Sequence, residues 1–374
     1  MPAEPPRRSD LSRPRPHHLL TTGEVAASGA AIAAVQEADG AVPWTVGGHV
    51  DVWNHVESAM ALLGAGQETA AARAWDWVTR TQRLDGSWPL KVTAGVVDDA
   101  SGESNMAAYV AVGVWHHWLV RRDEAFVRAL WPTVRAALDL VCRLQLPFGG
   151  IAWSQEWDDG RPATVNEEAL LAGSSSIHHA LRAGLTLAEL LDDPQPEWEL
   201  TAGRLGHALR EHRDGFLDKS TFSMDWYYPV LGGAVRGPAA HELIASRWHE
   251  FVVPGLGVRC VDTDPWVTGA ETCELVLALD ALGDDERARR LFDDAQHLRR
   301  PDGSYFTGYV YPDQVHWPAE HTTYTTAVVL LTDDALGGRT PGADLVRGAG
   351  LTADPEPFGL ACGCSSADAF AGRP

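Results

Sequence analysis

Hydrophobic residues recur along most of the chain at intervals of three and four, the spacing that places them on one face of an α-helix. This pattern predicts an all-α fold across residues 22–338. The expected helices cover residues 22–38, 51–63, 67–83, 103–119, 123–145, 173–191, 195–213, 224–231, 236–250, 266–282, 284–299 and 319–337.

A short pattern repeats six times between these helices: an apolar helix end, a glycine that often follows aspartate, and then an aromatic or β-branched stretch. Glycine after a helix readily adopts the left-handed conformation that ends it. The marker glycines lie 40 to 66 residues apart, which is enough chain for two helices. They are Gly40, Gly86, Gly149, Gly215, Gly255 and Gly303. The repeat therefore predicts six helical hairpins.

The two helices of a hairpin differ in composition. The helix after each marker is rich in small, uncharged residues, as in residues 104–115, whereas its partner carries more charge, as in residues 284–298. A helix that is apolar on most sides belongs in an interior, and one with a polar face belongs outside. We therefore predict an (α/α)6 toroid with six inner and six outer helices. An open α-solenoid is the alternative.

Charge and composition narrow the partners. Asp and Glu outnumber Lys and Arg by 51 to 30, a formal net charge of -21, which opposes binding to nucleic acid. No apolar run is long enough to span a membrane. The odd number of cysteines, five, favours a reduced, cytoplasmic protein. The Pro/Arg-rich residues 1–21 are expected to be disordered, and the Gly/Ala-rich residues 339–374, with Cys362 and Cys364, to form a flexible tail.

The segments that join each marker to the next inner helix should all meet at one end of the ring, and they hold most of the unusual residues. They offer carboxylates, aromatic rings and hydrogen-bonding side chains, a combination suited to a small-molecule substrate. The candidates for substrate binding are His49, Asp51, Trp53, Asp99, Glu103, Asn105, Asp225, Trp226, Tyr227, Trp266, Glu271, Tyr311, Asp313 and Trp317.

These residues also admit structural roles. Asp51, Asp225 and Asp264 fall at or just before helix starts, where aspartate caps free backbone N–H groups. Taken together, however, carboxylates that converge in a low-dielectric cavity raise one another's pKa, and one of them then stays protonated as a general acid requires. Neither a HExxH motif nor a phosphate-binding glycine loop occurs, so we expect neither metal nor cofactor.

The Asp-Gly-aromatic turns, QRLDGSW at 82–88 and RRPDGSYFTGYVYP at 299–312, resemble the repeats of the prenyltransferase and squalene-cyclase toroid superfamily. The resemblance implies an α/α barrel in which aromatic faces stabilise carbocations and an aspartate protonates an alkene. Asp262 and Asp264 partly match the Asp-x-Asp-Asp protonation motif of the cyclases, with Pro265 in place of its last residue. The aromatic wall would comprise Trp226, Tyr227, Trp266 and Trp317.

A second resemblance leads to a different chemistry. Residues 104–141, followed by GGIAWSQEWDDG at 149–160, look like six-hairpin glycosidases of the glucoamylase type. That family has a Trp-Glu segment at its catalytic mouth, which would make Glu156 a candidate acid. Two carboxylates would then protonate the glycosidic oxygen and activate water.

We therefore expect a prenyltransferase- or terpene-cyclase-like toroid enzyme that uses an acidic, aromatic-lined cavity for acid-initiated or isoprenoid chemistry. One alternative is a carbohydrate-active glycoside hydrolase, and the other is a ring that binds a ligand or partner without catalysis. The substrate is accordingly an isoprenoid or a sugar. The candidate catalytic residues are Asp262, Asp264, Glu320 and Glu156.

Overall fold

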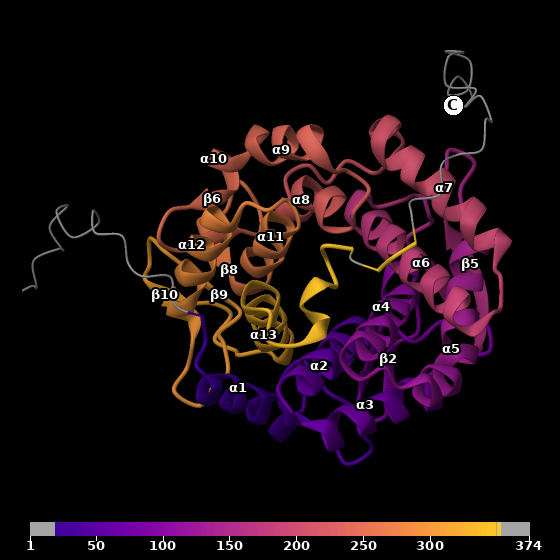
Figure 1. Cartoon of the computed structure of the whole chain (residues 1–374), viewed down its shortest axis with the longest axis horizontal. Coiled ribbons are helices and arrows are strands. Elements are labelled where there is room, and N and C mark those ends of the chain that lie inside the picture. Colours follow the sequence, from indigo (N-terminus) through magenta and orange to yellow (C-terminus); the bar gives the residue numbers. More distant parts are fainter. Residues whose placement is uncertain (1–18, 349, 353–374) are drawn as a thin grey trace, which may run out of the picture.

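The computed structural model describes residues 19–348 and 350–352, which form two concentric layers of helices (Figure 1). The inner layer contains α2 (Val52–Gly64), α4 (Ser104–Arg121), α6 (Leu171–Leu191), α8 (Ser223–Leu231), α11 (Gly269–Ala281) and α13 (Thr323–Gly337). The outer layer contains α1 (Thr22–Val35), α3 (Glu68–Thr81), α5 (Glu124–Arg143), α7 (Pro196–Glu211), α9 (Gly237–Ser246), α10 (Trp248–Phe251) and α12 (Asp285–Ala295). All predicted helices are present, and the one expected at 236–250 is divided between α9 and α10.

The inner helices form a closed ring. Each packs against the next in the order α2, α4, α6, α8, α11 and α13, and α13 packs against α2 (Figure 1). An open solenoid would leave its first and last hairpins apart. The (α/α)6 toroid is therefore confirmed and the solenoid alternative is wrong.

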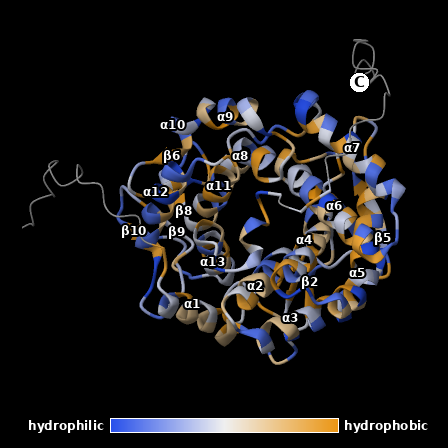
Figure 2. Cartoon of the chain, in the orientation of Figure 1, coloured by the Kyte–Doolittle hydropathy of each residue, from blue (hydrophilic) through white to orange (hydrophobic). Residues whose placement is uncertain are grey.

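Burial separates the two layers as the composition predicted. Residues 52–63 of α2 are all buried. In contrast, α12 buries only Ala288, Leu291, Phe292 and Ala295, which follow the three- and four-residue spacing of a single apolar face. Figure 2 shows hydrophilic positions along the outer edge of the ring. Among the described residues no helix is both long and apolar enough to cross a bilayer.

A glutamine connects each of the first three marker turns to the next outer helix. Gln82 Nε2 donates to the carbonyl oxygen of Gly86, at 3.2 Å, and to that of Thr133 on α5, at 2.9 Å. Gln36 and Gln145 make the corresponding pairs of hydrogen bonds. The Gln-to-Gly repeat is thus a structural staple between consecutive hairpins.

Two markers differ from the expected left-handed stop. Gly215 ends a short 3-10 helix, Arg213–Gly215, without a positive φ, because the α7 helix end tightens into a 3-10 turn. Gly255 lies in a turn between two short strands rather than at a helix end. The spacing of the repeat predicted where both connections lie, although their backbone conformations differ from the left-handed helix end that we expected.

Within residues 19–348 and 350–352, three small antiparallel sheets, which the helical pattern did not predict, lie in the segments before inner helices. One pairs β1 (Lys91–Thr93) with β2 (Val96–Asp99), and a second has the order β3 (Gly102–Glu103), β4 (Ser154–Asp158), β5 (Arg161–Asn166). The third has the order β10 (Val315–His316), β9 (Gly308–Val310), β8 (Trp266–Thr268), β7 (Gly257–Arg259), β6 (Val252–Val253). The strands are too short for periodicity to reveal.

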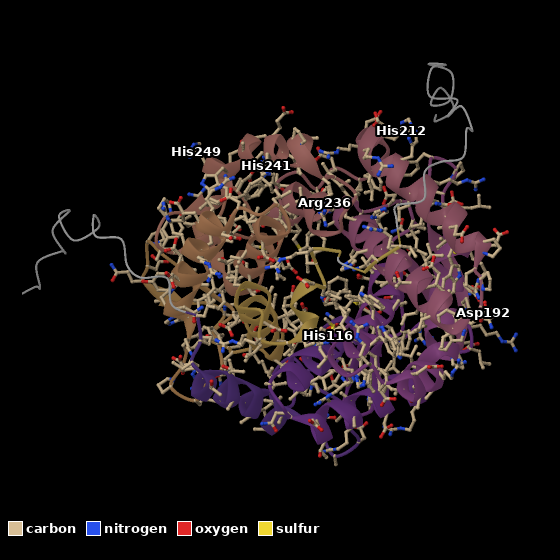
Figure 3. All side chains as sticks on the ribbon, viewed as in Figure 1. His116, Asp192, His212, Arg236, His241 and His249 are labelled. Atoms are coloured by element: carbon tan, nitrogen blue, oxygen red, sulfur yellow. The ribbon has the colours of Figure 1, made fainter. Side chains whose placement is uncertain are left out.

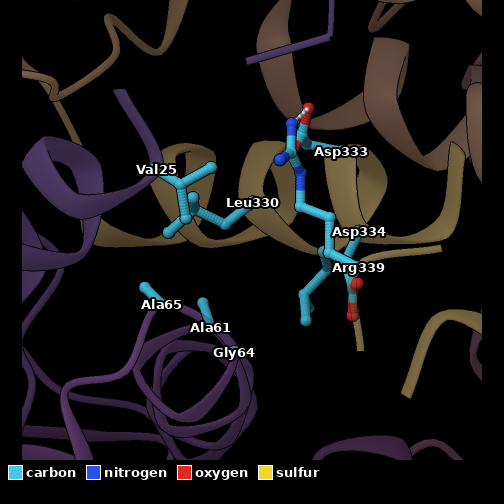
Figure 4. Close-up of a pocket in the computed structure, with 9 residues that line it drawn as sticks. Val25, Ala61, Gly64, Ala65, Leu330, Asp333, Asp334 and Arg339 are labelled. Carbon is cyan, nitrogen blue, oxygen red and sulfur yellow. Dashed lines mark hydrogen bonds and ion pairs between the residues drawn. The ribbon is translucent and has the colours of Figure 1, made fainter. Parts of the chain in front are cut away.

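A C-terminal strap, residues 339–348 and 350–352, crosses the ring at the end where the inner helices finish (Figure 1). Arg339 Nε contacts the buried Asp333 carboxylate at 2.5 Å (Figure 4). Arg347 donates to both oxygens of Asp280, at 2.7 and 2.9 Å. The strap therefore forms a floor that ion pairs attach to α13 and α11.

Side chains from an inner helix and from the segment before the outer helix α9 also contact the strap. Arg236 donates to the carbonyl oxygen of Val346 at 3.2 Å, and His116 lies against Gly342. Figure 3 shows both side chains toward the ring centre, whereas Asp192 and His212 lie at its edge. The strap is thus embedded among residues of several hairpins.

These contacts correct the boundary predicted for the flexible tail. Residues 339–352 were expected in that tail, but arginine pairing and apolar packing hold the described part of this segment on the toroid. The remainder of the predicted tail, with Cys362 and Cys364, lies outside the described residues. So do residues 1–18 of the predicted disordered segment.

Candidate active site

The N-terminal ends of the six inner helices meet at one end of the ring, which we call the mouth. Backbone contacts connect the segments that precede them. Val50 bridges to Val92, and Thr323 N donates to Trp44 O at 2.9 Å. The acidic and aromatic segments therefore converge as predicted, opposite the floor formed by the strap.

The ring order places two pairs of carboxyl groups on opposite walls. Since α4 lies opposite α11, Glu103 at the start of α4 is across the mouth from Glu271 in the first turn of α11. Likewise, Asp51 at the start of α2 is across from Asp225 in the first turn of α8. Acid and base catalysis on one bond needs two carboxyl groups on either side of it.

Asp51 is held rigidly. Its carboxylate caps α2 by accepting a hydrogen bond from Asn54 N at 2.9 Å, as predicted, and it also accepts one from Trp44 Nε1 at 2.6 Å. The Asn54 side chain donates to it as well, and His49 Nε2 lies 3.9 Å away. Burial raises the pKa of Asp51 despite these bonds. Its oxygens are consequently occupied by fixed donors.

Glu103 lies near Asp51, at the N-cap of the next inner helix, α4, and makes no capping hydrogen bond. Burial, followed by repulsion from Asp51 and Asp99, raises the pKa of Glu103 to about 7, against a smaller opposing effect of Lys91. A carboxyl group with this pKa holds a proton near neutral pH and can give it up. Glu103 therefore has the properties of a general acid.

The other predicted residue with a strongly raised pKa is Asp225, at about 6, chiefly because of burial. Its carboxylate accepts a hydrogen bond from Ala172 N at 3.3 Å, at the start of α6. Asp225 thus connects two inner helices. It does not occupy the N-cap of α8, where Phe222 stands.

Below the mouth, two buried glutamates that sequence reasoning missed face the ring interior. Glu274 accepts hydrogen bonds from the phenols of Tyr228, at 2.7 Å, Tyr324, at 2.8 Å, and Tyr227. Burial raises its pKa to about 7. Glu57 accepts one from Trp53 Nε1 at 3.2 Å, and burial together with repulsion from Glu274 raises its pKa well above the ordinary value.

A cavity of about 40 Å³ lies between these glutamates and the floor. His179, Ser176 and the strap residues Leu345 and Val346 are among the residues that line it. A buried water needs about 10–15 Å³ on this measure, so the cavity has room for a few waters but not for a sugar ring.

Aromatic rings line the wall between α13, α2 and α4. Trp53 stacks on Tyr109 with ring centroids 3.8 Å apart, and Trp44 lies 5.3 Å from His49 and 5.8 Å from Tyr324. On the neighbouring segment, Trp266 and Trp317 are 5.3 Å apart, and both are accessible.

Some predicted residues lie away from this centre. Glu156 is exposed on β4 and Asp264 is exposed before α11, whereas Asp262 is paired with Arg247 at 3.0 Å. Trp226 is buried against Phe251 under the outer helix α9. Glu320 is half-buried before α13, where its charge acts on His49.

The remaining candidates have simpler settings. Asp99 accepts hydrogen bonds from Ser101, which lower its pKa, and Asn105 lies near Gly173 on α6. Tyr311 lies under the Arg259 guanidinium, and Asp313 is exposed. The structure thus brings together His49, Asp51, Trp53, Glu103, Glu271 and Glu320 around the mouth and places Asp313 and Glu156 at its periphery.

The missed residues, Glu57, Glu274, Tyr109 and Tyr324, carried a recognisable signal. Each glutamate stands inside a helix that is apolar on nearly all sides, where an unpaired charge is costly. A carboxyl group in such a helix therefore indicates a polar interior. Among the described residues, no group of three or more His, Cys, Asp or Glu side chains is placed to hold a metal ion.

Solved structures with the same architecture include a wild-type glycosidase, with a TM-score of 0.66 and 18% identity across 85% of this chain and 98% of that one. A GH63 mannosylglycerate hydrolase from Thermus thermophilus has a TM-score of 0.61 and 15% identity across 82% and 99%. A D-mannose isomerase has a TM-score of 0.60 and 12% identity across 83% and 96%. The chain therefore has the (α/α) toroid fold that these two glycoside-cleaving enzymes and the isomerase share.

The sequence comparison identifies the family within this class. An MMP endo-(1,4)-3-O-methyl-alpha-D-mannosidase of Mycolicibacterium hassiacum is 52% identical over 354 residues, which are 94% of this chain and 96% of the relative. The chain belongs to that family of glycoside hydrolases. No family model matches it.

This membership corrects the leading functional prediction. Prenyltransferase- or terpene-cyclase-like chemistry is wrong, and the carbohydrate-active alternative is supported. One of the two turns that suggested isoprenoid chemistry, at residues 82–88, carries a glutamine staple between hairpins. Because that motif stabilises the ring and does not act on a substrate, it indicates the fold of the protein and not the substrate.

Proposed function

We propose that the protein is an endo-acting α-mannosidase that hydrolyses 1,4 linkages within chains of 3-O-methylmannose. The observation that carries this proposal is the 52% identity to the Mycolicibacterium hassiacum mannosidase along nearly the whole of both chains. An open mouth above a closed floor is consistent with it, because a glycan can lie across the mouth without a chain end entering the ring.

Glu103 is the proton donor in this proposal. Its pKa of about 7 leaves it partly protonated at neutral pH, and it makes no capping hydrogen bond that would stabilise its ionised form. Glu271, on the opposite wall, is the base that activates water. Asp51 acts through Glu103, because its fixed negative charge helps to keep that residue protonated.

The spacing of the ring favours inversion at the anomeric carbon. Packed helices lie about 8–10 Å apart, so opposite helices in a ring of six are separated by roughly twice that distance. Side chains that reach inward from both walls leave room for a water molecule beside the sugar, as inverting enzymes require. An α-linked substrate should then release a β-anomer first.

The sugar substrate is held by the accessible aromatic and polar groups of the mouth. Trp266, Trp317 and Trp44 offer flat surfaces for sugar rings, and His49 and Glu320 offer hydrogen bonds to hydroxyl groups. Glu57 and Glu274 lie deeper and position the tyrosines and Trp53 beneath the substrate.

The test is incubation of the purified protein with α-1,4-linked 3-O-methylmannose oligosaccharides, with products identified by mass spectrometry and the first-formed anomer by NMR. Glu103→Gln and Glu271→Gln should each lower kcat by about a thousandfold while the melting temperature stays nearly constant. Glu199→Gln, on the exposed face of α7, is the matched control. The absence of shortened products from the wild-type protein would refute the proposal.

A further inference from the structure

Exposed large apolar side chains gather at the mouth. Eight such residues occur among the described positions, and seven of them lie in segments that precede inner helices, although these segments form a minority of the chain. The seven are Val46, Leu84, Val96, Val97, Phe222, Val315 and Trp317, and the eighth is Leu200 on the outer helix α7. Single exposed apolar residues scattered on a surface need no explanation, but a concentration around one opening does.

Five of these residues form what we call the apolar rim: Val46, Val96, Val97, Val315 and Trp317. They occupy the segments before α2, α4 and α13, three helices that are neighbours in the ring. Their exposed fractions are 79% for Val46, 65% for Val96 and 56% for Trp317. The apolar rim is therefore an accessible arc along one side of the candidate active site.

The apolar rim rests on a firm backbone. Val96 and Val97 lie on the β1–β2 hairpin, which the Val50–Val92 bridge ties to the segment before α2. Trp317 O accepts a hydrogen bond from Trp266 Nε1 at 2.7 Å, which fixes the segment that carries it. Hydrogen bonds therefore hold the backbone that carries these apolar side chains in a defined position.

Such an arc is poorly suited to an ordinary polysaccharide. A free hydroxyl group pressed against valine loses its hydrogen bonds to water and gains no partner. A methyl ether has no donor to satisfy at that oxygen and adds a methyl group whose burial is favourable. Valines beside acidic, sugar-binding positions therefore favour a glycan that is polar on its ring face and apolar at its methoxy groups.

We propose that the apolar rim is a subsite that binds the methoxy groups of an O-methylated glycan and discriminates against chains with free hydroxyl groups. This inference rests on the proposed function and assigns its substrate selectivity to residues apart from the carboxyl groups. Chain segments on either side of the cleaved bond contact the apolar rim, and methylated chains are bound in preference to unmethylated ones of equal length.

The test measures binding, so that it does not depend on turnover. Calorimetry on Glu271→Gln protein compares matched α-1,4-mannose oligosaccharides with and without 3-O-methyl groups. The methylated chain should bind at least about tenfold more tightly. Adding Val96→Thr and Val97→Thr, which retain β-branched side chains in the hairpin, should reduce that preference several-fold. Leu200→Thr is the matched control and should leave the preference unchanged.

Equal affinity for the two chains, no binding of either, or an unchanged preference in the double variant would each overturn this inference. Circular dichroism and thermal melting establish that the double variant is folded, and Val46→Thr provides a second change on a different segment. Selective binding by a protein that cleaves neither chain would support the subsite and refute the hydrolase. Cleavage with no preference for the methylated chain would support the hydrolase and refute the subsite.

Discussion

The carboxyl group of Asp51 repels that of Glu103 across the gap between α2 and α4, and with burial it raises the pKa of Glu103 to about 7. Asp51 cannot move away, because Trp44 and the backbone of Asn54 hold its oxygens. One residue therefore controls the protonation of another while remaining fixed itself.

The first prediction concerns the pH dependence of hydrolysis. If Glu103 donates the proton, kcat/KM should fall as pH rises through about 7. Asp51→Asn removes the repulsion, lowers the pKa of Glu103 and should move this fall to lower pH by up to about one unit. Asparagine remains a good N-cap, so the helix is kept.

A profile of kcat/KM against pH measures this shift. Asp76→Asn, which changes an exposed charge on α3, should leave the profile in place. A profile that moves to higher pH in Asp51→Asn would contradict the assignment of the donor.

The second prediction concerns the buried Glu57. Its pKa in the folded protein is raised well above the ordinary value by burial and by Glu274, so the folded state retains protons that the unfolded chain releases. Stability from this group is fully present below the pKa of the unfolded chain, near 4.5, and is lost as pH rises through the folded pKa. Glu57→Gln should lessen that loss and raise the free energy of unfolding at pH 8 by about 1 kcal/mol.

Urea unfolding at pH 5 and pH 8 tests this prediction. The hydrogen bond from Trp53 Nε1 can be kept, because glutamine retains a carbonyl oxygen. A variant that is less stable than wild type at pH 8 would show that the ionised glutamate stabilises the ring.

The third prediction concerns the attachment of the strap. Arg347 contacts Asp280, a residue buried on α11, through two hydrogen bonds. Arg347→Ala leaves that carboxylate without its partner and should lower the free energy of unfolding by about 3 kcal/mol. Arg290→Ala, which breaks an exposed pair with Glu286 on α12, should cost only about 0.5 kcal/mol. Equal losses in the two variants would mean that the strap is not held by this pair.

The fourth prediction concerns the marker turns. Gly86 has a φ of 97°, and an added Cβ atom would lie 2.0 Å from the carbonyl oxygen of Ala136. Gly86→Ala should therefore destabilise the protein by about 4 kcal/mol, through both strain and overlap. Gly95 has a φ of 77° in open space, so Gly95→Ala should cost only about 1 kcal/mol. Thermal unfolding of both variants separates the two effects.

The architecture was predictable because it depends on the periodic spacing of apolar residues, which tertiary packing reinforces. Apolar spacing located α2 and α12, and composition assigned them to different layers. The Gln82-to-Gly86 turn was recognised as a repeat, but its staple to Thr133 spans 51 residues and is not visible in local sequence.

The candidate site was predictable only in part. Asp51, Glu103 and Glu271 were identified because they precede or begin inner helices. Their roles depend on which helices lie opposite, and that follows from closure of the ring. Glu274 was missed because its three tyrosine partners come from α8 and α13 and lie 46 to 50 residues away.

The closure of the ring has a consequence for synthesis on the ribosome. The apolar surface of α2 emerges early, yet its partner α13 and the floor strap are the last described parts to be made. Nascent chains therefore carry an unfinished ring with exposed apolar surface until α13 and the strap have been made. A chain that stops shortly before residue 339 would lack the floor strap and would leave the buried carboxylates of Asp333 and Asp280 without their arginine partners.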